Sequence, residues 1–264
     1  MSDLAQIIDD LRAEGEQLYT FLKTLEPADW SRATTFKSWT VNDVVEHLHM
    51  SDYLGVTSHK GTDEFIALRE QMSDPKLKPG EFSKQITGNT TGVELLERWK
   101  ALFTEMCDRF ATTEPGRRLT WVGPDMEISM FATARFMETW SHSWAIYDMM
   151  GATKKSADSI KHIVGIGVRT YGWTFVNRQI PRPEPKPYVK LTAPSGEIWE
   201  WNEPQADNIV EGSAVEFCQV VTQCRNIADV NLSVVGGPAN QWMEVAQCFA
   251  GPPNDPPTAG SRLK

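Results

Sequence analysis

The sequence predicts an α + α/β chain: an N-terminal four-helix bundle followed by a smaller C-terminal α+β domain. Three observations predict this fold class. In residues 1–151, apolar side chains recur at three- and four-residue steps, which is typical of helices that bury one face. A run of alternating prolines over residues 181–187 then makes a stiff, extended connector. Beyond it, short runs typical of β-strands alternate with helical segments.

Two helices are expected near the N-terminus. Apolar residues from Leu4 to Leu25 follow helical spacing, and Pro27 closes the segment. The second helix is expected to begin at Thr40, whose hydroxyl can cap the first turn while Asp43 returns a hydrogen bond. This capping-box pattern marks a helix start in the sequence.

A third helix follows a long, irregular stretch. Residues 59–92 mix charged residues with prolines and glycines, so we expect a loop with one short helix over residues 64–72. Thr91 and Glu94 repeat the capping-box pattern. The third helix should therefore begin there and run to Phe110.

The fourth helix, over residues 129–150 with Gly151 as its C-terminal stop, is the most informative segment. Six of its residues follow alternating steps of four and three, which is the spacing of one continuous seam on a bundle helix. The core of such a bundle is where facing side chains commonly build metal sites. The six positions are Phe131, Arg135, Glu138, His142, Ala145 and Met149.

The second half of the chain changes character. A helix over residues 156–177 leads into the proline-rich connector. Strand-like runs over residues 188–192 and 197–201 flank Pro194-Ser195-Gly196, a turn sequence that predicts a hairpin. The remaining expected elements are a helix over residues 213–226, a strand over 231–235 and a closing helix over 238–249.

These elements divide the chain into four segments. Residues 1–151 form the helical bundle, 152–187 a connecting helix and Pro-rich linker, and 188–251 the α+β domain. Residues 252–264 hold several prolines and few apolar residues, so we expect a flexible tail.

Composition narrows the classes of partner. The chain has 264 residues, enough to bury a core, and its 26 Lys and Arg against 35 Asp and Glu give a net charge of −9. This acidic balance argues against nucleic acid, and no run of about 18 apolar residues predicts a membrane span. Four unpaired cysteines indicate reduced thiols, and ten tryptophans can line a cavity or fill a core. We expect a cytoplasmic monomer or homodimer that acts on a small molecule.

Two candidate metal ligands lie on the fourth helix. Glu138 and His142 are four residues apart, so both project from one side, where a divalent cation could take an oxygen and a nitrogen. The same spacing also occurs by chance as a solvated intrahelical ion pair. The core-directed seam favours a metal, because a buried unpaired carboxylate is costly. An ion pair of Glu138 with Arg135 or with His142 is the alternative.

A third ligand could come from the second helix. His47 and His49 are two residues apart and so point in different directions. His47 is three residues after Val44 and therefore lies on the apolar side. A core histidine bonded to a backbone carbonyl is the alternative interpretation of His47.

Two segments carry a resemblance to a known family. The first, residues 39–48, is WTVNDVVEHL, and the second, residues 137–142, is METWSH. Together they resemble the DinB-like superfamily and, within it, the mycothiol-dependent maleylpyruvate isomerase group. Residues 212–218 and 242–253 are similar to the C-terminal domain of those relatives, so the resemblance covers most of the chain. It implies a four-helix bundle followed by a small α/β domain.

The resemblance also implies a metal site. Carried over to this chain, His47, Glu138 and His142 would hold a divalent metal, usually zinc in that family. Three protein ligands leave at least one position open, which is the mark of a catalytic zinc site. In that family the open position is thought to activate the thiol of a small cofactor, mycothiol, because a thiol on a divalent cation is deprotonated near neutral pH.

The chain departs from its relatives at two places. Many of them carry an aspartate three residues after the second histidine, where this chain has Ala145, which puts the role of that aspartate in doubt here. Relatives often show paired arginines where this chain has Cys224-Arg225. Arg225 is therefore the candidate catalytic residue for holding a substrate carboxylate, and a surface arginine at a helix end is the alternative. Trp140 and Trp144, one turn apart, either line the cofactor site or only pack between helices.

The chemistry that the resemblance implies is addition of an activated thiolate to a double bond of a small anionic substrate. Departure of the thiolate after rotation would make an isomerase, whereas retention would make a transferase. A metal-bound hydroxide would instead favour a hydrolase or hydratase. A non-catalytic metal-dependent binding or stress-response protein, and a bundle whose Glu–His pair only fixes helix register, are further alternatives. The ligand set does not choose among them.

Overall fold

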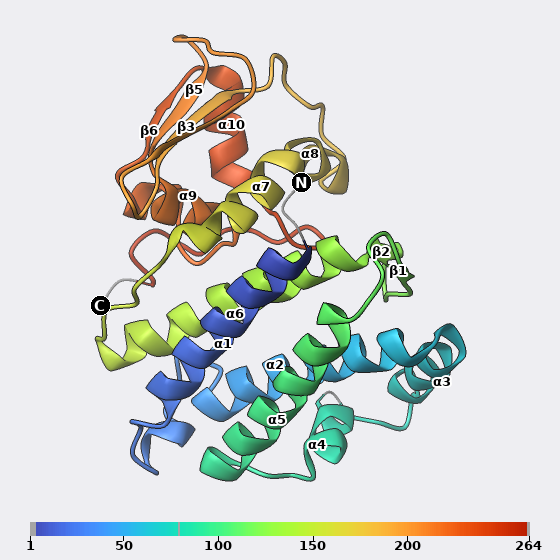
Figure 1. The fold of residues 1–264 in the computed structure, drawn as a ribbon. Helices are drawn as coiled ribbons and strands as arrows, with labels where there is room; N and C mark the ends of the chain where they lie inside the picture. The colour runs from blue at the N-terminus through green and yellow to red at the C-terminus, as the bar shows by residue number, and fades with distance from the viewer. Residues whose placement is uncertain (1–3, 79, 263–264) are drawn as a thin grey trace. The chain divides into compact units, whose positions relative to one another are not determined.

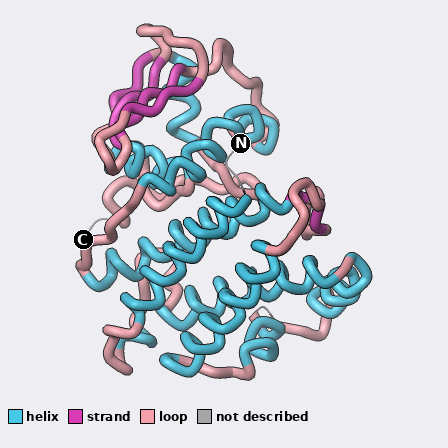
Figure 2. Tube along the Cα trace, viewed as in Figure 1, coloured by secondary structure: helices cyan, strands magenta, loops and turns pink. Residues whose placement is uncertain are grey.

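The computed structural model describes residues 4–78 and 80–262, and the chain divides into two compact units with the boundary between Ile146 and Tyr147 (Figure 1). The first unit is almost entirely helical, and the second combines helices with a four-stranded sheet (Figure 2). This confirms the predicted fold class, a helical N-terminal part followed by a smaller α+β part.

Four long helices form the first unit, as the apolar spacing predicts. They are α1 (Leu4–Leu22), α2 (Val41–Lys60), α5 (Gly92–Ala111) and α6 (Ile128–Met150), the last of which continues into the second unit. Gly15 of α1 lies against Phe103 of α5, where a Cβ atom would come within 2.3 Å of the ring. The absence of a side chain at Gly15 therefore lets these two helices approach closely.

The start of α2 confirms one predicted cap. The Asp43 amide donates to the Thr40 hydroxyl at 3.2 Å, and the Thr40 amide donates to the Asp43 carboxylate at 2.8 Å. The same pattern at the start of α5 does not form a capping box. Thr91 makes no capping side-chain bond there, and the first amide of α5, at Gly92, donates to the Asn42 side chain at 2.7 Å.

The stretch expected to be mostly loop holds two helices. One is α3 (Thr62–Met72), whose Phe65 and Leu68 pack against Leu54 of α2. The other is α4 (Glu81–Thr87), which the sequence did not predict. It is fixed to α2 by a 2.5 Å hydrogen bond from the Ser83 hydroxyl to Glu46, so a tertiary contact supports a segment with little periodicity of its own. The short pieces of this unit are η1 (Asp29–Ser31), β1 (Arg118–Leu119) and β2 (Met126–Glu127).

The helix expected over residues 156–177 is broken in the structure. It consists of η2 (Asp158–Ile160), α7 (Lys161–Arg169) and α8 (Tyr171–Asn177). The Thr170 hydroxyl, which lies at the break, donates to the carbonyls of Ile166 and Gly167. Such back-bonding by a threonine competes with the helical ladder and bends helices.

The sheet of the second unit has the strand order β4-β3-β5-β6. The predicted hairpin is confirmed, since β3 (Tyr188–Thr192) pairs antiparallel with β4 (Ile198–Trp201). The strand β5 (Ile209–Ser213), which pairs parallel with β3, was not expected, because its five residues include only two large apolar side chains. The edge strand β6 (Ser233–Val235) pairs antiparallel with β5. The other elements are α9 (Ala214–Val221), η3 (Ile227–Asp229) and α10 (Gly237–Val245).

The segment expected to be a flexible tail is held by hydrogen bonds over its described part. Asn254 donates to Gln223 and to Gln247, and Asp255 accepts from Arg178 at 2.8 Å. Further along, the amide of Gly260 donates to an aspartate of η3. Polar side chains of the second unit therefore replace the apolar contacts that this segment lacks.

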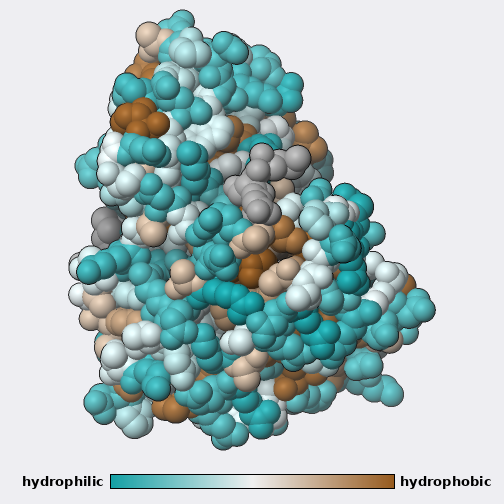
Figure 3. Space-filling view, in the orientation of Figure 1, coloured by the Kyte–Doolittle hydropathy of each residue, from teal (hydrophilic) through white to brown (hydrophobic). Residues whose placement is uncertain are grey.

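The exposed surface agrees with the acidic, polar composition. On the face drawn in Figure 3, hydrophilic residues cover most of the area and apolar residues form small separate patches. No helix among the described residues combines the length and the apolar character that crossing a bilayer requires.

Candidate metal centre

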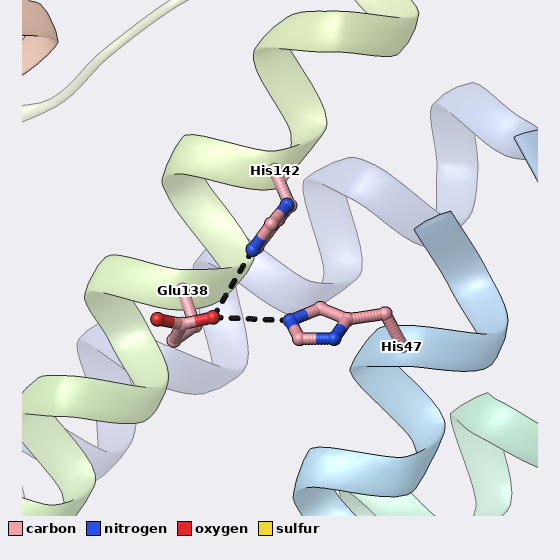
Figure 4. Close-up of side chains that lie close together, drawn as sticks. All are labelled: His47, Glu138 and His142. Carbon is pink, nitrogen blue, oxygen red and sulfur yellow. Dashed lines mark hydrogen bonds and ion pairs between the residues drawn. The ribbon is translucent and has the colours of Figure 1, made fainter. Parts of the chain in front are cut away.

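Two helices of the first unit bring together the three predicted ligands. Figure 4 shows Glu138 and His142 on neighbouring turns of α6, with His47 facing them from α2. One carboxylate oxygen, Oε2 of Glu138, lies 3.2 Å from Nε2 of His47 and 3.2 Å from Nε2 of His142. The three ligand atoms all lie within 4.8 Å of one another.

The local sequence explains how each side chain reaches this point. On α2, Val44, Val45 and Leu48 are fully buried, and His47 follows Val44 by three residues, so it turns toward the same side. The four-residue spacing of Glu138 and His142 places both on one face of α6. The side chains of His47, Glu138 and His142 remain 32%, 24% and 14% exposed, so the cluster is enclosed but reachable from solvent.

The electrostatics favour an ionised Glu138 carboxylate and a neutral His47 ring. Burial alone would raise the pKa of Glu138, but hydrogen bonds from His142 and His47 outweigh it and hold that pKa well below its ordinary value. Burial and the nearby charge of His142 lower the pKa of His47. A Glu138 carboxylate that stays ionised and a His47 ring that resists protonation are the forms in which these two groups can bind a divalent cation.

The geometry fits a small divalent cation. Ligand atoms about 2.0–2.2 Å from zinc in a tetrahedral site are roughly 3.3–3.6 Å apart. The two oxygen–nitrogen separations of 3.2 Å are close to that edge length. All three residues are also of the types that zinc prefers.

The alternative pairing of Glu138 with Arg135 is not what the structure shows. Nε of Arg135 donates to Asp52 of α2 at 2.9 Å, and Nε1 of Trp99 donates to the other oxygen of Asp52 at 3.0 Å. Asp52 is fully buried. Arg135 therefore belongs to a separate buried ion pair, one helical turn from the cluster, and Glu138 keeps both histidines as partners.

The second histidine of α2 lies outside the cluster. His49 is buried, and burial together with the charge of Arg98 lowers its pKa to about 4. Arg98 belongs to α5, and His49 is not among the residues whose ligand atoms converge on Glu138. The sequence left open whether His47 or His49 is the third candidate ligand, and in the structure only His47 lies at the cluster.

Aromatic rings other than those of Trp140 and Trp144 contact the cluster. Phe36 and Trp39, from the loop before α2, contact the ring of His142. Trp39 belongs to the family-like segment that precedes His47, but nothing in the sequence singled out Phe36, which lies in an irregular loop. Trp140 is fully buried and packs edge-on against Trp144 at 5.6 Å, so their role in cofactor binding stays a prediction.

Arg225 lies in the second unit, and the carboxylate it holds in the structure is one of the protein's own. Its two terminal nitrogens donate to the two oxygens of Asp148, each at 2.7 Å, and its side chain is only 8% exposed. This is the bidentate geometry that the sequence predicted for a substrate carboxylate. Binding of a substrate by Arg225 stays a prediction. Ala145 is buried.

Comparisons with known proteins agree with this picture. A family model described as the mycothiol maleylpyruvate isomerase N-terminal domain matches residues 11–147. Two uncharacterised proteins of Mycobacterium tuberculosis, from strains CDC 1551 / Oshkosh and ATCC 25618 / H37Rv, are each 32% identical over 256 residues, which cover 96% of this chain and 98% of theirs.

Solved structures share the fold. A crystal structure of the mycothiol-dependent maleylpyruvate isomerase has a TM-score of 0.54 and 12% identity, over 83% of this chain and 88% of that chain. A histidine-to-alanine mutant of that isomerase has a TM-score of 0.52 and 14% identity with the same coverage. At these identities the similarity concerns the arrangement of the helices and strands.

Proposed function

Because the chain belongs to the mycothiol maleylpyruvate isomerase N-terminal domain family, we propose that it is a metal-dependent enzyme that uses a low-molecular-weight thiol to isomerise a small anionic substrate. The observation that carries this proposal is the convergence of His47 and His142 on one oxygen of Glu138. Zinc is the metal that this set of ligands suits best, and mycothiol is the thiol that the family name suggests.

The three residues of the cluster would contribute different ligand atoms to a bound cation. Glu138 supplies negative charge, and its low pKa keeps it ionised throughout the neutral range. His47 and His142 would each supply one ring nitrogen. A divalent cation bound there would lower the pKa of a thiol at its open position and leave a nucleophilic thiolate.

The reaction on the substrate follows from thiolate chemistry. Addition of the sulfur to an activated carbon–carbon double bond turns it into a single bond, which can rotate. Elimination of the same thiolate then restores the double bond in the other geometry, and the thiol is recovered unchanged. The partial exposure of all three ligands gives both molecules a route to the centre.

The first test is metal content. After purification with added zinc, elemental analysis should find about one metal per chain in the wild type and a large loss in the His142→Ala variant. His49→Ala is a matched control, because His49 lies on α2 but outside the cluster. Less than about 0.1 metal per wild-type chain would contradict the proposal.

The second test concerns the thiol and the product. Mycothiol or glutathione added to the cobalt form should produce a sulfur-to-cobalt absorption band, and maleylpyruvate should be converted to its trans isomer. A stable thioether product would identify a transferase instead. Metal binding without any thiol band would favour a non-catalytic binding protein.

A further inference from the structure

Two aromatic side chains of one loop, Phe36 and Trp39, contact the histidines of the candidate metal centre. The indole of Trp39 lies 5.9 Å from the ring of His142 and almost parallel to it, with 11° between the planes. The same indole lies 5.2 Å from the ring of His47. The ring of Phe36 packs edge-on against two rings, with 5.2 Å between its centroid and that of His142 and 5.0 Å between its centroid and that of Trp39. One tryptophan therefore contacts a ligand from α2 and a ligand from α6.

The backbone of this loop is held in an unusual conformation. Lys37 and Ser38 both have positive φ angles, 51° and 57°, although neither is a glycine. Left-handed backbone is unfavourable for such residues, and it persists where the surrounding structure demands it. Two backbone hydrogen bonds hold the loop in this conformation. The Thr34 amide donates to the Trp39 carbonyl at 2.7 Å, and the Trp39 amide donates to the Phe36 carbonyl at 2.8 Å.

This conformation determines where the two aromatic rings go. The tight turn at Lys37 and Ser38 folds Phe36 back onto Trp39, so both rings face His142. Trp39 is only partly buried, so core packing alone does not account for its position. Its ring contacts are with Phe36 and with the two metal-ligand candidates.

We propose that Trp39 is a positioning residue of the metal centre, and that the Thr34–Trp39 loop exists to hold its indole against His47 and His142. An imidazole can rotate about its side-chain bonds, and only one orientation aims Nε2 at the Glu138 oxygen. A flat ring packed against both imidazoles removes the other orientations before a cation arrives. Mutation of the outer hydrogen-bond partners that orient metal ligands typically costs about 10- to 100-fold in metal affinity, and we take that range as the scale for loss of the indole.

The proposal rests on the proposed function, since it requires that the cluster binds a metal. The test compares cobalt and zinc binding to metal-free wild type, Trp39→Phe and Trp39→Leu. Phenylalanine keeps a flat ring, whereas leucine keeps apolar volume without one. Trp121→Leu is the matched control, because the ring partners of Trp121 are Phe65 and Phe131 rather than the ligands. Circular dichroism confirms that each variant is folded.

We expect Trp39→Leu to bind cobalt about tenfold or more weakly than wild type, with an altered cobalt absorption spectrum that reports changed ligand geometry. Trp39→Phe should stay close to wild type, and Trp121→Leu should match wild type in both measurements. Equal affinity and an unchanged spectrum in Trp39→Leu would overturn the positioning role while leaving the proposed function intact. Failure of the wild type itself to bind cobalt or zinc would overturn both.

Discussion

At the scale of single residues, Glu138 is the centre of the site, because one of its oxygens lies 3.2 Å from each histidine. Replacing it with glutamine removes the charge and keeps the shape. We expect Glu138→Gln to weaken zinc binding by more than the roughly 10- to 100-fold that loss of an outer partner costs. Competition with a chromogenic chelator measures this change.

A neighbouring carboxylate provides the control for that variant. Glu46 lies one residue before His47 and accepts a hydrogen bond from Ser83 instead of a histidine. Glu46→Gln should therefore keep wild-type zinc affinity. Equal affinities of Glu138→Gln and Glu46→Gln would show that the carboxylate of Glu138 is not a ligand.

The cysteines give a second prediction at this scale. Burial raises the pKa of Cys107 to about 12 and that of Cys224 to about 11, and it raises the pKa of Cys218 as well. Since the thiolate is the reactive form, these thiols should react with iodoacetamide far more slowly than free cysteine at pH 8. Mass spectrometry before and after denaturation checks this, and rapid labelling of Cys107, Cys218 or Cys224 in the native protein would contradict it.

At the scale of elements, two contacts set the register between α2 and α6. In the first contact, His47 of α2 pairs with Glu138 of α6. In the second, Asp52, five residues after His47, pairs with Arg135, three residues before Glu138. The opposite directions of these two steps show that the helices pack antiparallel along this seam. The buried ion pair therefore supports the same alignment that brings the ligands together.

Breaking that ion pair should destabilise the first unit. Asp52→Asn leaves the Arg135 guanidinium buried without its counter-charge, so we expect a loss of about 3–5 kcal/mol in the free energy of unfolding. Urea denaturation measures it. The double variant Asp52→Leu/Arg135→Met should lose less free energy of unfolding than Asp52→Leu and Arg135→Met lose together, because it leaves no buried charge unpaired. Additive losses would mean that the two side chains act independently.

The cap of α2 has a smaller, local effect. Thr40→Ala removes the hydroxyl that accepts from the Asp43 amide, and we expect a loss of about 1 kcal/mol. Thr91→Ala is the control, since Thr91 makes no capping side-chain bond at the start of α5. The two variants should differ in urea denaturation, and equal losses would contradict the importance of the capping box.

Helices with caps and regular apolar spacing could be predicted from the sequence, because both signals are local. The start of α2 at Thr40 is one example. The helix α4 and the strand β5 could not, because each is short and depends on a partner: Ser83 of α4 bonds to α2, and β5 pairs with β3. The break at Thr170 depends on a hydroxyl that can either face solvent or bond to its own helix.

At the scale of the whole molecule, metal binding should be linked to folding. A ligand that binds only the folded state at 100 times its dissociation constant adds about 2.7 kcal/mol of stability. For a chain of this size, each kcal/mol shifts the melting temperature by about 2–4 °C. Zinc should therefore raise the melting temperature of the wild type, and a chelator should reverse the shift. The His142→Ala variant should show neither effect, and an equal shift in that variant would place the metal elsewhere.

The sequence by itself determined the helical class of the N-terminal half, the α+β class of the C-terminal half and the shared face of Glu138 and His142. All of these follow from spacing along one segment, which needs no knowledge of its neighbours. The family-like segments extended this to His47, and the ligand set matches the cluster that the structure forms.

Only the tertiary structure decided which groups surround that face. It brought His47 rather than His49 to Glu138, paired Arg135 with Asp52, and placed the indole of Trp39 against the rings of both candidate histidine ligands. Each of these contacts joins side chains from different elements, and its formation depends on the register and rotation of packed helices. A sequence shows which side chains are available, but packing determines which of them meet.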